Sequence, residues 1–150
     1  MISFFVAGEP KPQPRPRPIP GRVGVYNPTT ANEWKAQVMA EAQKHRPPAP
    51  IDGPVRVGLT FQFDRPNSHF KAAKGVVTLK PDAPFFHATK PDCDNLEKAV
   101  LDAITNTGGF WSDDAAVAWI STRKLYAGPG CPTGCMIQIL PMKNQYHDKP

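Results

Sequence analysis

The chain has 150 residues, of which 40% are hydrophobic and 21% charged, and it carries a formal net charge of +5. This composition is typical of a globular domain, and at this length a domain buries enough surface to fold without disulfides. No apolar run approaches the roughly 20 residues of a membrane-spanning helix, and the first residues lack the basic region of a signal peptide. We therefore expect one domain over residues 1–150, located in the cytoplasm and not associated with a membrane.

Three cysteines, Cys93, Cys131 and Cys135, cannot all pair with one another within one chain, which fits a reducing compartment. Cys131 and Cys135 form a C-x3-C pair across a Pro-Thr-Gly turn. A zinc site there would need two further ligands, and none of the four histidines can be assigned to it. We interpret the pair as structural.

The first predicted strand covers residues 2–6, a short apolar run that ends at Ala7-Gly8. The arm that follows, residues 8–22, has a proline at nearly every second position. Because proline fixes φ and lacks a donor, this arm should be extended and stiff. Its bases would then be held out to contact DNA phosphates; they are Lys11, Arg15, Arg17 and Arg22. The alternative is a rigid linker or a ligand for a partner domain.

The next elements are a possible second short strand at residues 23–26 and a helix at about 31–45. Thr30 and Glu33 have the spacing of a capping box, and Pro47 and Pro48 end the helix. Trp34 is expected in the core. Residues 54–63 alternate apolar and polar side chains with a period of two, which predicts a strand with one buried face.

Residues 64–90 show no sustained period, and we interpret them as a long loop or insertion with a short helix or strand near residues 75–79. Lys71 and Lys74 in this loop would suit DNA contact. The alternating pattern at 116–126 and the apolar run at 136–140 predict two further strands, which we expect to form a hairpin. The polar tail, residues 142–150, should be frayed. Together these elements predict an α+β domain in which a small mixed or antiparallel sheet packs against two main helices.

Residues 91–114 contain six acids and one base, a local charge of −5, so the remainder of the chain carries +10. The acids are Asp92, Asp94, Glu97, Asp102, Asp113 and Asp114, and the base is Lys98. Like charges held together raise one another's pKa unless a cation joins them. This concentration therefore predicts a metal site, while the +10 remainder predicts a polyanionic partner such as DNA.

A helix should run from a cap at Asp94 to about Thr105, with its apolar residues on one face and Asp94, Lys98 and Asp102 stacked on the other. An ordinary amphipathic helix would explain Asp94 and Lys98 alone. We expect the later turn, anchored by Phe110-Trp111, to bring the acids at 113–114 back toward the helix start. Three or four carboxylates would then converge on a hard cation, with one ammonium beside them.

The central segment reads Asp92-Cys93-Asp94-Asn95-Leu96-Glu97-Lys98-Ala99-Val100-Leu101-Asp102-Ala103-Ile104 and is followed, after a turn, by Asp113-Asp114. It resembles the D-x-D-N-L-x-K-x-x-x-D-A-L signature and later D-D pair of the RusA family of Holliday-junction resolvases, found in phages and prophages. The arm resembles the family's N-terminal pattern, with Gly8-Glu9-Pro10, Arg15-Pro16-Arg17-Pro18 and Tyr26-x-Pro28. The likeness covers most of the chain except residues 65–89 and the tail.

This resemblance implies a RusA-like fold and a Mg²⁺-dependent endodeoxyribonuclease, with Mn²⁺ as a substitute, that acts as a homodimer on branched DNA such as a four-way junction in a bacterial host cell. It implies that Asp92, Asp94 and Asp114 are the catalytic metal ligands and that Lys98 is the catalytic lysine. Asp113 is a further candidate. Cys93 departs from the apolar residue usual between the two aspartates, and the long insertion could change the preferred branch geometry.

Two other functions fit the same residues. One is a module that binds branched DNA without cutting it, its acids serving only as caps and turns. The other is a metal-dependent phosphohydrolase of small nucleotides, which would leave the basic arm without a role. The salt dependence of binding separates a DNA-binding protein from a small-nucleotide hydrolase. Affinity that depends on contacts with many phosphates falls steeply as the salt concentration rises, whereas the affinity of a small-substrate site does not.

Overall fold

The computed structural model describes residues 1–144, and its centre is a four-stranded sheet with the strand order β1-β8-β4-β7. β1 and β8 pair antiparallel, as do β8 and β4, whereas β4 and β7 run parallel. The strands are β1 (Ile2–Ala7), β4 (Val55–Phe63), β7 (Val117–Tyr126) and β8 (Gly134–Pro141). The predicted α+β class with a mixed sheet is confirmed.

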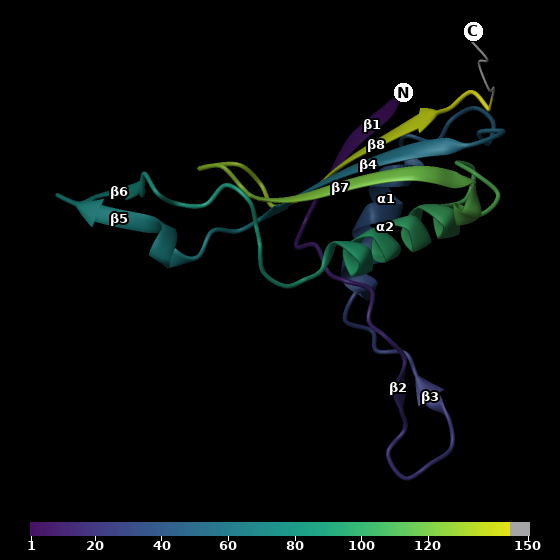
Figure 1. Ribbon diagram of the computed structural model, residues 1–150, viewed down its shortest axis with the longest axis horizontal. Coiled ribbons are helices and arrows are strands. Elements are labelled where there is room, and N and C mark those ends of the chain that lie inside the picture. The colour runs from purple at the N-terminus through teal and green to yellow at the C-terminus, as the bar shows by residue number, and fades with distance from the viewer. Residues whose placement is uncertain (145–150) are drawn as a thin grey trace, which may run out of the picture.

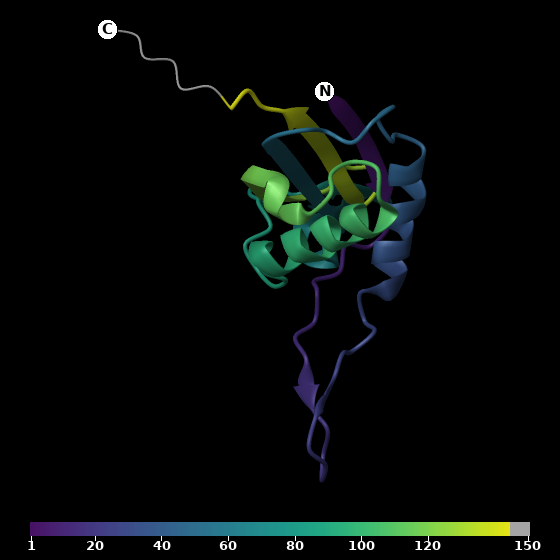
Figure 2. The same cartoon turned by 90° about the vertical axis from the view of Figure 1, so that its right-hand side faces the viewer.

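Two helices, α1 (Asn32–Gln43) and α2 (Cys93–Thr107), cover one face of this sheet (Figures 1 and 2). The buried positions of β4 alternate along the strand and face the helices. Trp34 of α1 is 1% exposed and Leu96 of α2 is fully buried, so both helices contribute to one core. The predicted core position of Trp34 is confirmed, and both predicted helices are present within two residues of their expected ends.

The parallel pairing of β4 and β7 follows from the helix between them, because parallel neighbours need a crossover connection. α2 and the long segment before it supply that crossover. β8 then pairs on the other side of β4, so β4 lies between β7 and β8. The predicted hairpin of the last two strands is therefore wrong. The connection at residues 127–133, which contains two glycines, is long enough to pass over the end of β4.

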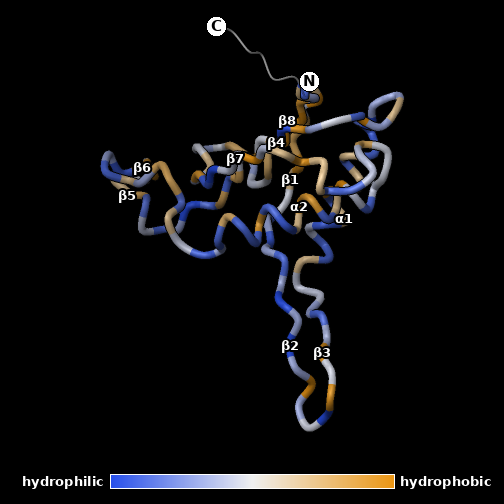
Figure 3. Tube along the Cα trace, turned by 45° about the vertical axis from the view of Figure 1, so that its right-hand side comes forward, coloured by the Kyte–Doolittle hydropathy of each residue, from blue (hydrophilic) through white to orange (hydrophobic). Residues whose placement is uncertain are grey.

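Two small hairpins project from the body in different directions (Figure 1). We call the first the finger; it pairs β2 (Arg17–Pro18) with β3 (Val25–Tyr26), so the predicted arm is one half of a hairpin. Blue and orange residues alternate toward the finger's tip (Figure 3). The second pairs β5 (Phe70–Ala73) with β6 (Val76–Leu79) after a short 3-10 helix at Asn67–His69. The short element predicted near residues 75–79 is thus a strand.

After the second hairpin the chain returns to the free edge of β7. The amide of His87 donates to the Lys124 carbonyl at 3.0 Å, and the amide of Tyr126 donates to the Phe85 carbonyl at 2.9 Å. These bonds partly cover an edge strand that would otherwise offer unpaired backbone groups. They also fix the segment that leads into α2.

Both predicted capping boxes are wrong. The N-cap of α1 is Ala31 rather than Thr30, and the N-cap of α2 is Asp92 rather than Asp94; neither makes a side-chain capping bond. Ala31 is 1% exposed, so packing against the body fixes the start of α1. Asp92 has an extended backbone, and its side chain turns to a lysine instead of to the helix amides.

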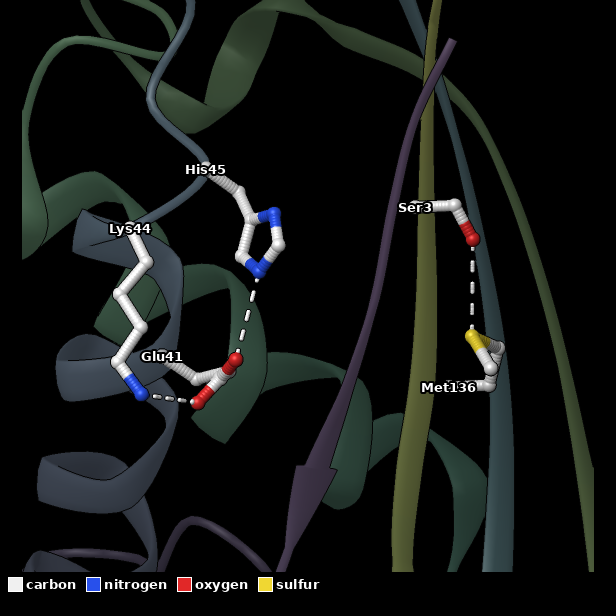
Figure 4. Close-up of polar contacts among 5 residues, drawn as sticks. All are labelled: Ser3, Glu41, Lys44, His45 and Met136. Atoms are coloured by element: carbon white, nitrogen blue, oxygen red, sulfur yellow. Dashed lines mark hydrogen bonds and ion pairs between the residues drawn. The ribbon is translucent and has the colours of Figure 1, made fainter.

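The C-terminal end of α1 is held by a small polar cluster next to β1 (Figure 4). Lys44 donates to Glu41 at 2.9 Å and the His45 ring lies 3.3 Å from the other carboxylate oxygen. Both contacts hold the pKa of Glu41 below its usual value. The His45 ring also stacks on Phe4 at a centroid separation of 4.9 Å, which ties the helix end to the sheet.

Within residues 1–144 the three cysteines are free: Cys135 is buried, Cys93 is half-buried and Cys131 is exposed. Burial raises the pKa of the Cys135 thiol far above its usual value. Neither helix of the described chain combines the length and apolar character needed to cross a membrane. Residues 142–144 form no helix or strand, and the rest of the predicted frayed tail, residues 145–150, lies outside the described residues.

Candidate active site at the start of helix α2

Two carboxylates stand exposed where the chain enters α2. Asp92 ends the extended segment before the helix, and Asp94 lies in its first turn. Lys98, also exposed, follows Asp94 by four residues and therefore lies on the same side of the helix. The opposite side carries Leu96, Ala99 and Val100, which are fully buried. The amphipathic pattern of α2 thus turns its two acids and one lysine outward.

Lysines hold the Asp92 carboxylate in its ionised form. Lys90 donates to Asp92 Oδ2 at 2.9 Å, and this bond is the main cause that holds the pKa of Asp92 below its usual value. Burial has the next largest effect and raises the pKa, while the positive charges of Lys90, Lys124 and Arg15 lower it further. Lys124 also donates to the carbonyls of Thr89 and Pro91 at 2.6 and 2.7 Å. It therefore positions the backbone that carries Asp92.

The base of the finger rests on the first turn of α2. The amide of Gln13 donates to the Asn95 carbonyl at 2.9 Å, and Lys35 of α1 donates to the Gln13 side chain at 3.1 Å. Lys35 also lies 3.9 Å from Asp102. The expected stacking of Lys98 beside Asp102 on one helix face therefore gives no ion pair between them, since α1 brings a different lysine to that acid. No ion pair within residues 1–144 involves Lys98.

The later acids, Asp113 and Asp114, lie at the other end of α2. Asp114 opens a short 3-10 helix that leads directly into β7 at Val117. Lys124, which contacts the backbone beside Asp92, lies seven residues further along that strand, or about 23 Å at strand spacing. The 15 residues of α2 span a similar length, about 22 Å. The Asp113 side chain accepts from the Ala115 amide at 2.7 Å and caps this turn.

The anchor residues explain this separation. Phe110 and Trp111 are buried at 0% and 3% exposure, and the Trp111 ring nitrogen donates to Thr105 at 2.9 Å. They hold the segment after α2 against the helix's C-terminal end. The expectation that they return the acids to the helix start is therefore wrong. Within residues 1–144, no cluster of three or more His, Cys, Asp or Glu side chains could hold a metal ion.

Asp92 and Asp94 carry the oxygen ligands that a hard cation prefers. Mg²⁺ keeps several waters and often takes only one or two carboxylates, with phosphate oxygens of the substrate completing its shell. Two exposed carboxylates two residues apart fit this manner of binding. They do not fit a closed site made by one chain alone.

Basic side chains flank these acids on both hairpins. Arg15, Arg17 and Arg22 are exposed on the finger, while Lys11, at its base, pairs with Glu9 at 2.9 Å. Lys71 is exposed on β5, and Lys74, with φ of 52°, forms the turn of the second hairpin. α2 begins between the two hairpins (Figure 1). The predicted DNA-contacting residues therefore lie on two sides of the candidate site, and their contact with DNA stays a prediction.

Sequence reasoning missed Lys90, Lys124 and Lys35 as neighbours of the site. Lys90 stands two residues before Asp92, and this spacing could have indicated an ion pair. Lys124 lies on the helix-facing side of β7, and only the crossover topology brings it to α2. The sequence could not indicate Lys35 as a neighbour of the site, because the packing of α1 against α2, and not sequence spacing, brings it there.

The chain is similar to a known protein family and to a known relative. The family model described as endodeoxyribonuclease RusA matches residues 7–139. A Bacillus subtilis (strain 168) protein called "Uncharacterized protein YqaN" is 34% identical over 137 residues, which cover 84% of this chain and 88% of that protein. The family match includes the finger, α2 and both pairs of aspartates, and the resemblance inferred from the sequence motifs is confirmed.

Proposed function

Because the chain belongs to the RusA family of endodeoxyribonucleases, we propose that it cuts branched DNA, such as a four-way junction, by Mg²⁺-dependent hydrolysis of a phosphodiester in each of two strands. Mn²⁺ should substitute for Mg²⁺. The observation that carries the proposal is the exposed group Asp92, Asp94 and Lys98 at the start of α2, between two basic hairpins. The proposed setting is the cytoplasm of a bacterial host, for a chain of phage or prophage origin.

Each residue at the start of α2 has a distinct proposed role. Asp92 and Asp94 would hold the metal ion, which supplies an activated water and polarises the scissile phosphate. Lys98, which forms no ion pair within residues 1–144, would contact that phosphate and counter the charge that builds on it. Lys90 keeps Asp92 ionised by donating to it. The arginines of the finger would offset the repulsion between these acids and DNA.

A homodimer would give each of the two equivalent strands of a junction its own site. The dimer also bears on Asp114, which lies roughly 20 Å from Asp92 in one chain by the length of α2. If Asp114 takes part in the same reaction, it must reach the site from a second copy of the chain. We therefore propose a homodimer in which the two copies share their acids.

The test of the nuclease is nicking of a synthetic four-way junction against linear duplex, with Mg²⁺ and with EDTA. Asp92→Asn and Asp94→Asn should each slow nicking by at least about 100-fold, a typical cost of removing an active-site electrostatic group. Both variants should still bind the junction. Asp52→Asn, which changes an exposed acid before β4 and outside the site, is the matched control. Full activity in either aspartate variant would contradict the assignment.

A second function also deserves a test, because residues 1–144 of one chain form no cluster of three or more metal-binding side chains. A protein that recognises a branch without cutting it would need the basic hairpins and no complete metal site. It would bind junctions tightly, and Mg²⁺ would produce no nicks at any protein concentration. The nicking assay above therefore separates the two functions.

A further inference from the structure

A cavity of about 460 Å³ opens between the start of the finger, the end of β4 and the segment before α2. Its volume lies within the range of roughly 300–1,000 Å³ that is usual for small-molecule sites. Its position adjoins the candidate active site, since Lys90 and Pro91 line it and Asp92 follows directly. The Lys90 ammonium both lines the cavity and donates to Asp92 at 2.9 Å.

Flat and apolar groups form much of the cavity wall. Pro10, Pro12 and Pro91 contribute proline rings, and Phe63 and His87 contribute aromatic ones. The His87 ring stacks on Phe63 at a centroid separation of 4.2 Å and is therefore fixed in place. Burial, with the nearby charge of Lys124, lowers the pKa of His87 and so favours the uncharged form of this ring. The proline rings, together with the parts of Phe63 and His87 that line the cavity, offer an apolar contact surface to a planar ligand.

The charges around the cavity balance. Two acids, Glu9 and Asp64, and two bases, Lys11 and Lys90, line it. A second cavity of about 470 Å³ lies on the other side of the finger base, and its charged lining residues are Lys35 and Lys98. The second cavity is thus suited to a phosphate. The first is suited to a neutral ligand with polar edges.

We propose that the first cavity receives one nucleobase that leaves the stack next to the scissile phosphate, which lies beside Asp92, Asp94 and Lys98. This inference rests on the proposed action on branched DNA, where bases at the branch lose neighbours and cost less to unstack. The Asp64 carboxylate, which has no ion-pair partner within residues 1–144, can accept from an exocyclic amino group of the base. Adenine, cytosine and guanine carry such a group, and thymine does not.

The test uses four-way junctions carrying 2-aminopurine at successive positions on either side of the branch, bound by the full chain without divalent cations. Fluorescence should rise at one position, because 2-aminopurine brightens when it leaves the stack. Thr133→Tyr places a ring in the cavity wall while keeping the backbone bond that Thr133 accepts from Gly8. Ala118→Tyr, at an exposed position on β7, adds the same ring outside the cavity and is the matched control.

The Thr133→Tyr variant should lose the fluorescence rise and bind the junction roughly 5- to 160-fold more weakly, as expected for the loss of one stacked base. Asp64→Ala, at an exposed position outside the core, should also reduce the rise, and it keeps the test valid if Thr133→Tyr fails to fold. An equal rise in wild type and both cavity variants, or no rise at any position, would overturn the proposal. Nicking by the wild type is scored separately with Mg²⁺: a fluorescence rise without nicking would contradict the nuclease and leave the base site standing.

Discussion

The finger offers the sharpest quantitative prediction, because its charges can be removed without disturbing the body. Arg15, Arg17 and Arg22 are exposed, and none of them forms an ion pair within residues 1–144. Replacing all three with glutamine should therefore leave the fold intact. If each arginine neutralises one DNA phosphate, each contributes about 0.9 to the slope of log affinity against log salt.

The triple variant should consequently show a slope that is shallower by about 2.7. Between 50 and 200 mM salt, the wild type should lose about 40-fold more affinity than the variant. Fluorescence anisotropy of a labelled junction at four or five salt concentrations measures both slopes. The control is an equal change of charge away from the finger, made by replacing Lys44, Arg56 and Lys143 with glutamine.

A change in slope smaller than about 1 would refute the reasoning, since it would mean that the finger does not follow the phosphate backbone. An equal change in the control would also refute it, because the effect would then come from net charge alone. Measuring linear duplex beside the junction shows whether the finger contributes to branch preference or only to general affinity.

Two further predictions concern the site and the helix that carries it. Lys90→Gln removes the main cause of the low pKa of Asp92, so that pKa should rise. The acidic limb of the plot of nicking rate against pH should then move to higher pH. A limb that stays in place would contradict the role of Lys90. Leu96→Ala, at a fully buried position of α2, should lower the free energy of unfolding by about 2–5 kcal/mol in urea titrations. Asn106→Ala, exposed on the same helix, should change it by no more than about 0.5 kcal/mol.

Local patterns in the sequence were sufficient to predict most helices and strands and the two acids at the start of α2. The period-two run at residues 54–63 and the apolar face of α2 predict buried faces that the structure confirms, because burial of alternate or helical positions depends on short spacings. Asp92 and Asp94 are also close in the sequence, with one residue between them. Such features need no knowledge of how distant segments meet.

Long-range pairing was what the sequence could not supply. Two apolar runs joined by a glycine-rich turn look like a hairpin, yet β4, far earlier in the chain, lies between β7 and β8. The same crossover brings Lys124 beside Pro91 and carries Asp114 away from Asp92. Capping also depended on context, since the packing of Ala31 fixes the start of α1 where the sequence favours Thr30.

The separation of Asp92 and Asp114 leads to a prediction that holds only if each active site of the dimer combines Asp92 of one copy with Asp114 of the other. Asp92→Asn and Asp114→Asn homodimers should each fail to nick a junction. In a mixed dimer whose copies share their acids, one site carries both substitutions and the other carries neither. Mixing the two inactive variants should therefore restore nicking at one of the two sites, which single-strand nicks on a labelled junction would reveal.

If Asp114 instead acts within its own chain, both sites of the mixed dimer carry one substitution, and mixing restores nothing. If the Asp114→Asn variant nicks normally, Asp114 has no role in the reaction and is only part of the short 3-10 helix before β7. Mixing two preparations of the same variant controls for changes in total protein concentration. The outcome decides between a shared and a separate site because α2, at about 22 Å, holds the two acids too far apart to bind one ion within a single chain.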